Sequence, residues 1–289
     1  MHSSNDIILK NISDLSERSS LISEQKNILI AMLAEQMSGD ASYSDVLSLY
    51  NLFCKDAVGV SLTDKICFCR ATAGVADAAF SDALSIMRSD TPISGALRGK
   101  IAFVKNLYNE SAYSRFSYVI KSPTPISYSS FEDSCDAVVS EVCEFVVLPI
   151  ENSVDGKMFS FYSLLDQYDL KIHSVCYIQP DNDAKTIRYA LAGKPNLRHC
   201  IGHEPSTYPQ IFEFSLSADT RVGGMDITSA AALCSANIHR VSTLPLSYND
   251  TIRFYYSLSM SAPEELKTFI IYLCLEYPQY TPIGLYREI

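Results

Sequence analysis

Apolar residues recur at helical spacing along the first third of the chain. Shorter helical patterns at residues 44–55 and 64–87 follow a long one at residues 6–37, and Pro92, Ser94 and Gly95 mark a boundary after them. No strand-like alternation interrupts these segments. Residues 1–95 are therefore predicted to form an all-helical domain, whose first helix is amphipathic and carries Ile8, Ile12, Leu15, Ile22, Leu29 and Leu33.

From residue 100 the period changes, and short apolar runs alternate with amphipathic segments. Such an alternation is typical of a parallel sheet covered by crossover helices. The residues that follow, 179–208, are less regular and predict only a short helix at 186–192 and a turn at 193–196. The pattern predicts strands at residues 101–104, 126–129, 145–148 and 170–178, and helices at 112–120, 131–142 and 159–168.

The last eighty residues follow a third pattern, with the element order βαββαβ. This order predicts a compact antiparallel sheet backed by two helices. The strands are expected at residues 211–216, 239–245, 251–260 and 281–289, and the helices at 226–236 and 263–277. The chain is thus predicted to be a multidomain α and α/β protein with domains at residues 1–95, 96–208 and 209–289.

One stretch combines a buried strand with polar groups that are suited to a ligand. The apolar run at residues 145–148 breaks at Pro149, and Glu151, Asn152 and Ser153 follow. Polar groups at the carboxyl end of a parallel strand point into the crevice where α/β proteins bind ligands. An ordinary loop in which Asn152 or Ser153 caps the next helix explains the same residues. The pattern alone leaves both interpretations open.

Composition and charge narrow the range of partners. The 289 residues are 47% hydrophobic and only 19% charged, which predicts a folded chain with real cores. A net charge of −10 without any Lys/Arg run argues against nucleic acid and membrane partners. No apolar run is long enough to span a membrane and no secretory signal precedes one, so a cytoplasmic protein is expected. The nine cysteines are expected to be reduced.

No metal ion and no cofactor are expected. His199, Cys200 and His203 lie close together, but no second His/Cys group stands at ligand spacing. Ser153 lacks the Gly-x-Ser-x-Gly setting of a hydrolase nucleophile. No glycine-rich phosphate loop is present. The sequence therefore predicts a function that needs neither a metal ion nor a cofactor.

The domain order and one motif resemble the bifunctional chorismate mutase–prephenate dehydratase family of phenylalanine biosynthesis. The dehydratase domain of that family has Pro-Ile-Glu-Asn-Ser followed by a glycine, and this chain has the same letters from Pro149 to Ser153, with Gly156 after them. The resemblance implies a small parallel α/β lobe of the periplasmic-binding-protein type. It also implies that the substrate-binding residues are Glu151, Asn152, Ser153, Gly156, Tyr113 and Ser114.

The last domain is similar to an ACT domain, a ferredoxin-like regulatory module. Gly223-Gly224-Met225 stands where the family has Gly-Ala-Leu, and Ser242-Thr243-Leu244-Pro245 stands where it has Glu-Ser-Arg-Pro. Such domains bind an amino acid, by resemblance phenylalanine, between paired copies. The resemblance therefore implies a homodimer or higher homo-oligomer, with effector contacts from Gly223, Gly224, Met225 and Leu244.

Two departures from the family weaken the expected chemistry. A dehydratase domain has a second lobe, and its catalytic Thr-Arg-Phe lies on the strand that returns from that lobe. Only about thirty residues separate Ile178 from the strand at 211, which is too few for a second lobe, and neither Thr220-Arg221 nor Thr251-Ile252-Arg253 stands at the expected place. The mutase reaction depends on cationic side chains that bind the substrate. In the helical domain, Gln25 stands where the mutase has a substrate-binding arginine, and only Asp45 matches the family.

Two hypotheses about function follow. In the first, the chain is a degenerate relative that binds a small aromatic or carboxylate ligand, such as phenylalanine, prephenate or a chorismate-like acid, and regulates without catalysing. In the second, it is an active chorismate mutase or prephenate dehydratase with phenylalanine feedback through the ACT domain. The lost cations and the lost lobe favour the first, and whether the chain is an enzyme stays open.

Overall fold

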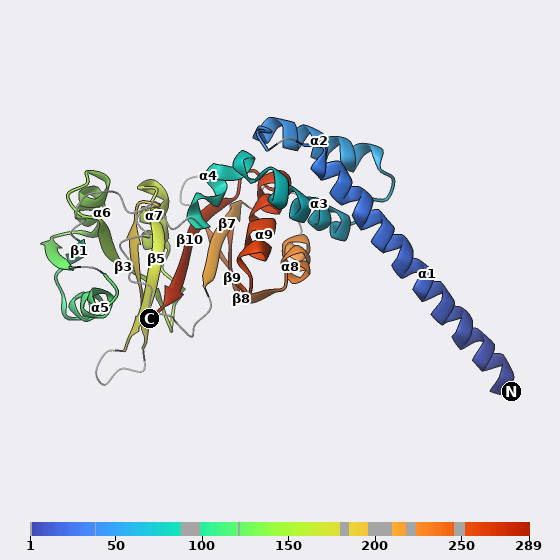
Figure 1. Ribbon diagram of the computed structural model, residues 1–289. Coiled ribbons are helices and arrows are strands. Elements are labelled where there is room, and N and C mark those ends of the chain that lie inside the picture. The colour runs from blue at the N-terminus through green and yellow to red at the C-terminus, as the bar shows by residue number, and fades with distance from the viewer. Residues whose placement is uncertain are drawn as a thin grey trace. The chain divides into compact units, whose positions relative to one another are not determined.

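The computed structural model describes residues 2–37, 39–87, 99–120, 122–179, 185–195, 210–217, 224–245 and 252–289 (Figure 1). Contacts divide the chain into two compact units. The helical unit comprises Met1–Ser81 and Pro263–Glu276, and the sheet unit comprises Asp82–Ala262 and Tyr277–Ile289. The boundary expected at residues 92–95 and the His199–His203 group lie outside the described residues.

The helical unit contains the long helix that the sequence predicts, α1 (His2–Glu35), followed by α2 (Tyr43–Asp56) and α3 (Leu62–Val75). Capping boxes begin the two shorter helices, with Ser42 and Asp45 at α2 and Ser61 and Asp64 at α3. The helix predicted to reach residue 87 ends at Val75, because Gly74 and Val75 are weak helix formers and Ala76 leaves the helical conformation. Its remainder forms three short turns, η1 (Asp77–Phe80), α4 (Ser81–Leu84) and η2 (Ser85–Met87).

A fourth helix of this unit comes from the C-terminal part of the sequence. α9 (Pro263–Glu276) packs against α3. Ion pairs join them, with 2.8 Å between Lys65 Nζ and Glu276 Oε2 and 2.8 Å between Arg70 Nη2 and Glu265 Oε2. The Tyr50 hydroxyl of α2 also donates to Glu276 at 2.6 Å. The segment expected to back the C-terminal sheet thus forms part of the helical bundle.

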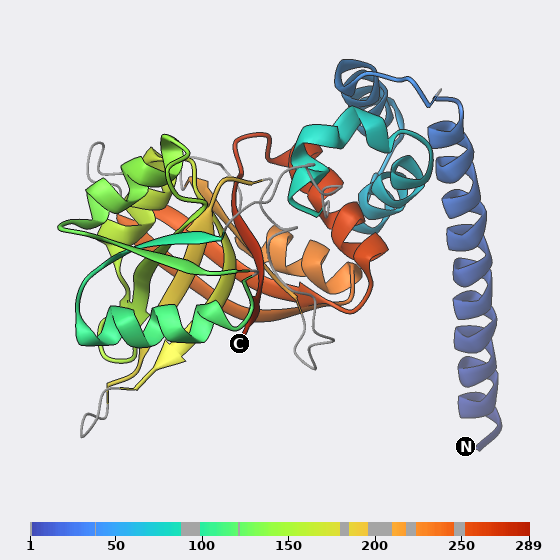
Figure 2. The same cartoon turned by 60° about the vertical axis from the view of Figure 1, so that its left-hand side comes forward.

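The sheet unit is built on a ten-stranded mixed sheet (Figures 1 and 2). β1 (Lys100–Val104), β2 (Thr124–Tyr128) and β3 (Phe145–Asn152) are parallel, as predicted. β6 (Ile187–Gly193) lies antiparallel between β3 and β5 (Lys171–Ile178), so the predicted all-parallel sheet is wrong, as is the helix at residues 186–192. A short, mostly apolar run such as residues 189–193 fits a buried strand as well as a helix segment, and here both faces of the strand are buried.

The remaining strands have the predicted βαββαβ order. β7 (Ile211–Ser217), α8 (Gly224–Leu233), β8 (Ala236–Pro245), β9 (Ile252–Met260), α9 and β10 (Thr281–Glu288) follow in sequence, and the strands pair in the ferredoxin-like order β10-β7-β9-β8. β10 also pairs in parallel with β5 and so joins both groups of strands in one sheet. Gly284 lies at this junction, where a Cβ would approach the Ile172 carbonyl oxygen to 2.5 Å.

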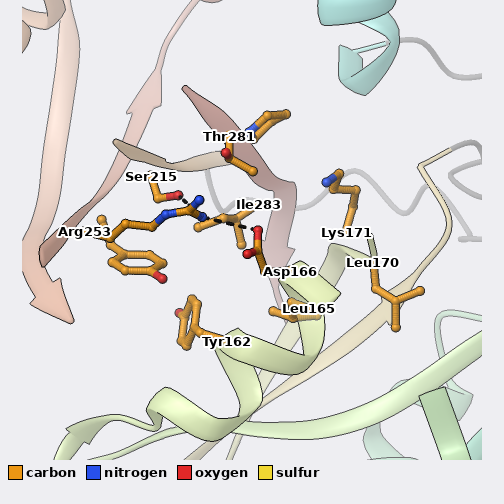
Figure 3. Close-up of a pocket in the computed structure, with 11 residues that line it drawn as sticks. Tyr162, Leu165, Asp166, Leu170, Lys171, Ser215, Arg253, Thr281 and Ile283 are labelled. Atoms are coloured by element: carbon orange, nitrogen blue, oxygen red, sulfur yellow. Dashed lines mark hydrogen bonds and ion pairs between the residues drawn. The ribbon is translucent and has the colours of Figure 1, made fainter. Parts of the chain in front are cut away.

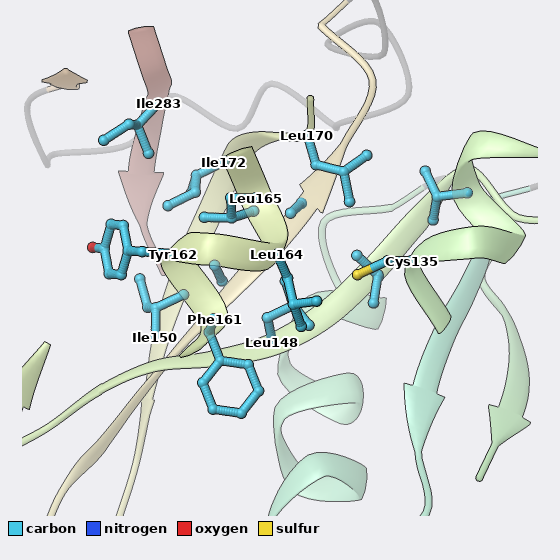
Figure 4. Packing of buried hydrophobic residues seen from close by; sticks show 14 of the residues in the cluster. Cys135, Leu148, Ile150, Phe161, Tyr162, Leu164, Leu165, Leu170, Ile172 and Ile283 are labelled. Carbon is cyan, nitrogen blue, oxygen red and sulfur yellow. The ribbon is translucent and has the colours of Figure 1, made fainter. Parts of the chain in front are cut away.

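Helices cover both faces of the β1–β6 half. α6 (Phe131–Val139) and α7 (Phe159–Gln167) pack on one face, where Leu148, Ile150 and Ile172 meet Leu164 and Leu165 (Figure 4). α5 (Leu107–Ser117) contacts β1, β3 and β5. It contributes Ala112 and Phe116 to the second core, which also holds Phe103, Phe145, Val147 and Leu191.

Candidate ligand-binding site

The Pro149–Ser153 stretch forms a hairpin at the end of β3. The sequence predicts that the strand stops at Pro149. The strand instead continues to Asn152, and the chain then turns and pairs with β3 through β4 (Gly156–Lys157). Proline is tolerated in the middle of this strand because it lies at a β-bulge, where the register with β6 shifts between Pro149 and Glu151. The missing N–H therefore falls where the hydrogen-bond ladder is already irregular.

Asn152 and Ser153 hold this hairpin together. The side-chain oxygen Oδ1 of Asn152 accepts from the backbone N–H groups of Val154 at 3.0 Å and Asp155 at 2.6 Å. The side-chain nitrogen Nδ2 of Asn152 donates to the Asp155 carboxylate at 2.9 Å. Ser153 Oγ accepts from the Thr186 N–H at 2.9 Å, which ties the hairpin to the start of β6. Neither residue caps α7, whose N-cap is Met158 without a side-chain bond. The capping interpretation is therefore wrong.

Gly156 completes the turn. Its φ of +76° lies in the left-handed region that glycine adopts without strain. The backbone conformation of the turn is sufficient to explain a glycine at this position, without a contact to a ligand. The match to the family motif is thus explained locally by the geometry of the hairpin.

Glu151 is a buried anion between two arginines. Its side chain accepts from Arg188 of β6 at 3.4 Å and from Arg240 of β8. Four strands, β5, β10, β7 and β9, separate β6 from β8 in the sheet. A contact between Arg240 and Glu151 therefore requires the sheet to curl, which brings β8 to the hairpin.

A second buried anion, Glu213 of β7, lies beside Glu151. Lys157 pairs with it, and the hydroxyls of Tyr162 and Tyr286 donate to it at 2.9 and 2.6 Å. Burial alone would raise the pKa of the Glu213 carboxyl, but Lys157 and Arg188 outweigh burial and lower the pKa to about 2. Burial lowers the pKa of Lys157, and Glu213 opposes that shift.

Arg188 connects the two anions. It donates through Nη2 to the Tyr286 hydroxyl at 2.8 Å and lies 3.5 Å from Glu288, in addition to its contact with Glu151. We call the following six side chains the buried charge cluster, which carries as many positive as negative groups: Glu151, Lys157, Arg188, Glu213, Arg240 and Glu288.

Two cavities adjoin this cluster, and Lys157, Tyr177, Arg188 and Arg240 line both. The hairpin cavity, of about 690 Å³, lies between residues 151–157 of the hairpin, Thr186 of the segment before β6, and residues 240–242 of β8. The strand cavity, of about 350 Å³, is completed by Ile211, His239, Ser257 and Glu288. Their sizes fall in the range of small-molecule sites.

The other predicted substrate residues lie elsewhere. Tyr113 stacks on Phe103 with 5.4 Å between ring centroids, and Ser114 Oγ donates to the Glu110 carbonyl of its own helix at 3.0 Å. Neither lines the hairpin cavity or the strand cavity. The structure thus brings Glu151, Asn152, Ser153 and Gly156 to one cavity and leaves Tyr113 and Ser114 outside it.

The predicted effector and mutase residues are likewise dispersed. Gly223 lies outside the described residues, Gly224 begins α8, and Met225 is 79% exposed. Leu244 is buried in the core that lies beneath α6 and α7. In the helical unit, Gln25 is exposed on α1 and Asp45 is engaged in the capping box of α2.

Arg253, from one of the two Thr/Arg segments considered in the sequence, lines a third, smaller pocket, whereas Thr220, Arg221 and Thr251 lie outside the described residues. Arg253 of β9 donates to Asp166 of α7 at 3.2 Å and approaches Ser215 Oγ at 3.5 Å (Figure 3). The pocket has a volume of about 20 Å³, which is room for little more than one water molecule. Arg253 therefore fastens α7 to the sheet.

The sequence-based prediction missed Lys157, Arg188, Glu213 and Arg240. A signal for one of them existed in Thr186-Ile187-Arg188-Tyr189, a Thr-x-Arg-aromatic segment at the start of β6. Assignment of these residues to a helix concealed it. Lys157 pairs with Glu213, and Arg240 pairs with Glu151, between segments that lie far apart in the sequence, so no local pattern encodes these contacts.

Within the described parts of the chain, no group of three or more His, Cys, Asp or Glu side chains is placed to hold a metal ion. The described helices also include none that is both long and apolar enough to cross a membrane.

Comparison with known proteins identifies the segment that holds the hairpin. The model of the prephenate dehydratase family matches residues 105–183. This part of the chain is prephenate dehydratase-like. The match includes β3, the hairpin and α7 and ends before β6, so Arg188, Glu213 and Arg240 lie beyond it. No curated protein matches the chain.

Solved structures show the same relationship for the fold. A prephenate dehydratase from Streptococcus mutans superposes with a TM-score of 0.53 and 16% identity, covering 65% of this chain and 98% of that chain. A prephenate dehydratase from Arthrobacter aurescens in complex with L-Phe gives 0.47 and 13%, covering 65% and 90%. GqqA, described as a novel type of quorum-quenching acylase, gives 0.48 and 18%, covering 65% and 94%. The first likeness shows a mixed α/β fold of the prephenate dehydratase kind.

Proposed function

We propose that this chain is a prephenate dehydratase-like protein that binds a small aromatic carboxylate and does not dehydrate it. The observation that carries this proposal is the state of the motif residues. Glu151 lies between two arginines, Asn152 closes a turn, and Ser153 accepts from a backbone N–H of the neighbouring segment. A dehydratase needs an acid placed for the departing hydroxyl, and these groups are engaged in holding the protein.

The connection between β5 and β6 supports the same proposal. It consists of residues 179–186, whereas the family resemblance implies a whole second lobe before the returning strand. A cleft closed by two lobes excludes water around a reacting dianion. Eight residues are too few to build such a lobe.

Positively charged side chains on the hairpin cavity are the reason for proposing that the chain binds a carboxylate. Lys157, Arg188 and Arg240 all line the hairpin cavity, and Arg donors are well suited to carboxylates. The phenylalanine, prephenate or chorismate-like ligands that the sequence suggests all carry a carboxylate. Tyr177 and Val241 add apolar surface to the same cavity.

We also propose that the chain pairs with a second copy along α1. Leu15, Ile22 and Leu29 stand seven residues apart on this helix and are 65%, 64% and 65% exposed. A seven-residue apolar repeat is the pattern by which helices associate. The effector function proposed for the βαββαβ strands, with phenylalanine between paired copies, would need such a dimer.

Two assays test the function. The purified chain is mixed with prephenate, and calorimetry measures binding while phenylpyruvate formation measures turnover. We expect heat of binding without phenylpyruvate. Phenylpyruvate formed at about 1 s⁻¹ or faster, near the low end of ordinary enzymes, would establish the alternative of an active dehydratase. The same assay with chorismate tests the mutase alternative.

A further inference from the structure

Two residues that line the cavity at the β3–β4 hairpin each carry a buried polar atom that lacks a partner. Arg188 Nε and Ser242 Oγ are buried side-chain atoms without a hydrogen bond among the described residues, and both residues line the hairpin cavity. The large majority of buried side-chain polar atoms have a hydrogen-bond partner. An unsatisfied N–H and an unsatisfied hydroxyl on two residues of one cavity wall therefore point to a missing acceptor.

The Arg188 side chain is buried and is held in place by its neighbours. Its side chain is 7% exposed, and Nη1 and Nη2 are held by Glu151, Tyr286 and Glu288, with the Tyr177 ring 6.0 Å from Cζ. Nε is the one guanidinium nitrogen without a hydrogen bond among the described residues. Because the guanidinium is held on its other sides, the direction of this remaining donor is fixed before any ligand arrives.

We propose that Arg188 Nε–H and Ser242 Oγ–H together bind the carboxylate of a small aromatic acid in the hairpin cavity. Arg188 comes from β6 and Ser242 from β8. The ligand would therefore bridge β6, which pairs with the hairpin strand β3, and β8 of the ferredoxin-like strands. This inference rests on the proposed function and names the residues that determine its specificity.

The proposal also identifies the wall that faces the hairpin. In a single lobe of this kind, residues 151–156 would face solvent. Here the curl of the sheet places residues 240–242 on the same cavity as the hairpin. β8 thus supplies contacts that a second lobe would otherwise have to supply.

A carboxylate is the acceptor that fits best. Both unsatisfied groups are donors, and a hydrogen bond from a donor to a charged acceptor is about twice as strong as a neutral one. The cluster is balanced in charge without a ligand, and Arg240 is half-exposed at the mouth of the cavity. One added negative charge is compatible with this setting, whereas a polyanion would meet Glu151 and Asp155 on the cavity wall.

The test uses a matched pair of probes on the full chain. Phenylacetate and phenylacetamide have the same shape and differ in charge, and isothermal titration calorimetry measures both. We expect phenylacetate to bind at least about tenfold more tightly than the amide. Equal affinity for the two probes would overturn the proposal. Prephenate turnover would refute the proposed function without affecting this comparison, so the two failures are distinguishable.

Variants locate the binding groups. Ser242→Ala should weaken phenylacetate binding about tenfold without lowering the melting midpoint, since this hydroxyl has no protein partner to lose. Ser242→Thr keeps the hydroxyl and should bind as the wild type does. Ser257→Ala, which changes the strand cavity only, is the matched control and should leave binding unchanged. Full binding by Ser242→Ala, or a loss in Ser257→Ala alone, would overturn the assignment.

Arg188→Lys provides the second measurement. It keeps the charge but removes the Nε–H, so the preference for phenylacetate over phenylacetamide should fall toward equality. If this variant does not fold, the serine variants still decide the outcome. An unchanged preference in a folded Arg188→Lys protein would contradict the role given to Nε.

Discussion

The two units depart in opposite directions from the usual distribution of polar and apolar side chains. α1 exposes a stripe of large apolar residues, whereas the sheet unit buries Glu213 completely together with its charge. An exposed apolar stripe is covered only by another apolar surface, but a buried carboxylate needs partners within its own fold. The buried charged groups of the described sheet unit thus pair with one another, whereas the apolar stripe on α1 stays exposed.

The Lys157–Glu213 pair of the sheet unit differs in the same way from exposed ion pairs of the helical unit. Arg70–Glu265 and Lys267–Asp77 in the helical unit involve side chains that are open to water. Such pairs contribute about 0–1 kcal/mol each. Lys157 and Glu213 are both withdrawn from solvent, so each charge depends on the other. Substitutions at the two kinds of pair should therefore have very different effects.

The largest effect is expected at Glu213. Glu213→Gln leaves Lys157 buried without its counter-charge and should lower the free energy of unfolding by about 3–5 kcal/mol. Chemical unfolding followed by circular dichroism measures this. Glu265→Gln in the helical unit is the matched control and should cost less than about 1 kcal/mol. Equal losses in the two variants would contradict the contrast drawn between the units.

Acid should destabilise the sheet unit through the same carboxyl. The pKa of Glu213 is lowered to about 2 from an ordinary 4.5, so the folded state binds this proton more weakly than the unfolded state. The stability that Glu213 contributes is present above about pH 4.5 and is lost as the pH falls toward 2. Melting midpoints measured from pH 6 to pH 2.5 should fall steeply at the acid end. A Lys157→Met, Glu213→Leu double variant should flatten that fall, and an unchanged slope would show that other carboxyls cause it.

A smaller effect is expected from two glycines, one in each unit. Gly284→Ala would place a Cβ 2.5 Å from the Ile172 carbonyl oxygen, where backbone cannot yield. It should cost about 1–3 kcal/mol, as other overpacked substitutions do. Gly74→Ala in α3 has nothing within 4 Å of the new Cβ and should stabilise its helix by up to about 1 kcal/mol. Thermal unfolding compares the two, and a stable Gly284→Ala variant would contradict the close β5–β10 pairing.

The smallest effect on folding is expected on α1. Leu15→Glu with Ile22→Glu removes exposed apolar surface and should change the stability of the monomer by no more than about 0.5 kcal/mol. It should, however, convert a dimer of twice 32.1 kDa into a monomer in light scattering. Ser20→Glu, at an exposed polar position on the opposite side of α1, serves as the control and should stay dimeric. A wild-type protein that is already monomeric would contradict the pairing along α1.

Much of the fold was predictable, because local periodicity encodes it. The long helix α1, the strands β1, β2 and β3, and the βαββαβ order of the last eighty residues all lie where the apolar pattern predicts them. The errors fall where local and tertiary signals compete. The β6 segment is mostly apolar and buried on both faces, so its period is ambiguous, and only its pairing with β3 and β5 decides that it is a strand.

The site was predictable only in part. Residues 149–153 were found because a motif preserves them, but the sequence could not reveal that their polar groups are engaged in a hairpin. Arg240 and Ser242 reach the hairpin across five intervening strands, and a contact of that kind depends on how far the sheet curls. Sequence spacing carries no record of such curvature, whereas it records the period of a helix directly.

The most direct test of the central claim is a single-turnover experiment with prephenate. With the chain in excess, nearly all prephenate is bound, and quenched samples show whether phenylpyruvate forms on the protein. We predict a calorimetric binding signal and no phenylpyruvate beyond the rate of the protein-free control. Conversion of the bound prephenate within seconds would contradict the account and would establish a working dehydratase with a single lobe.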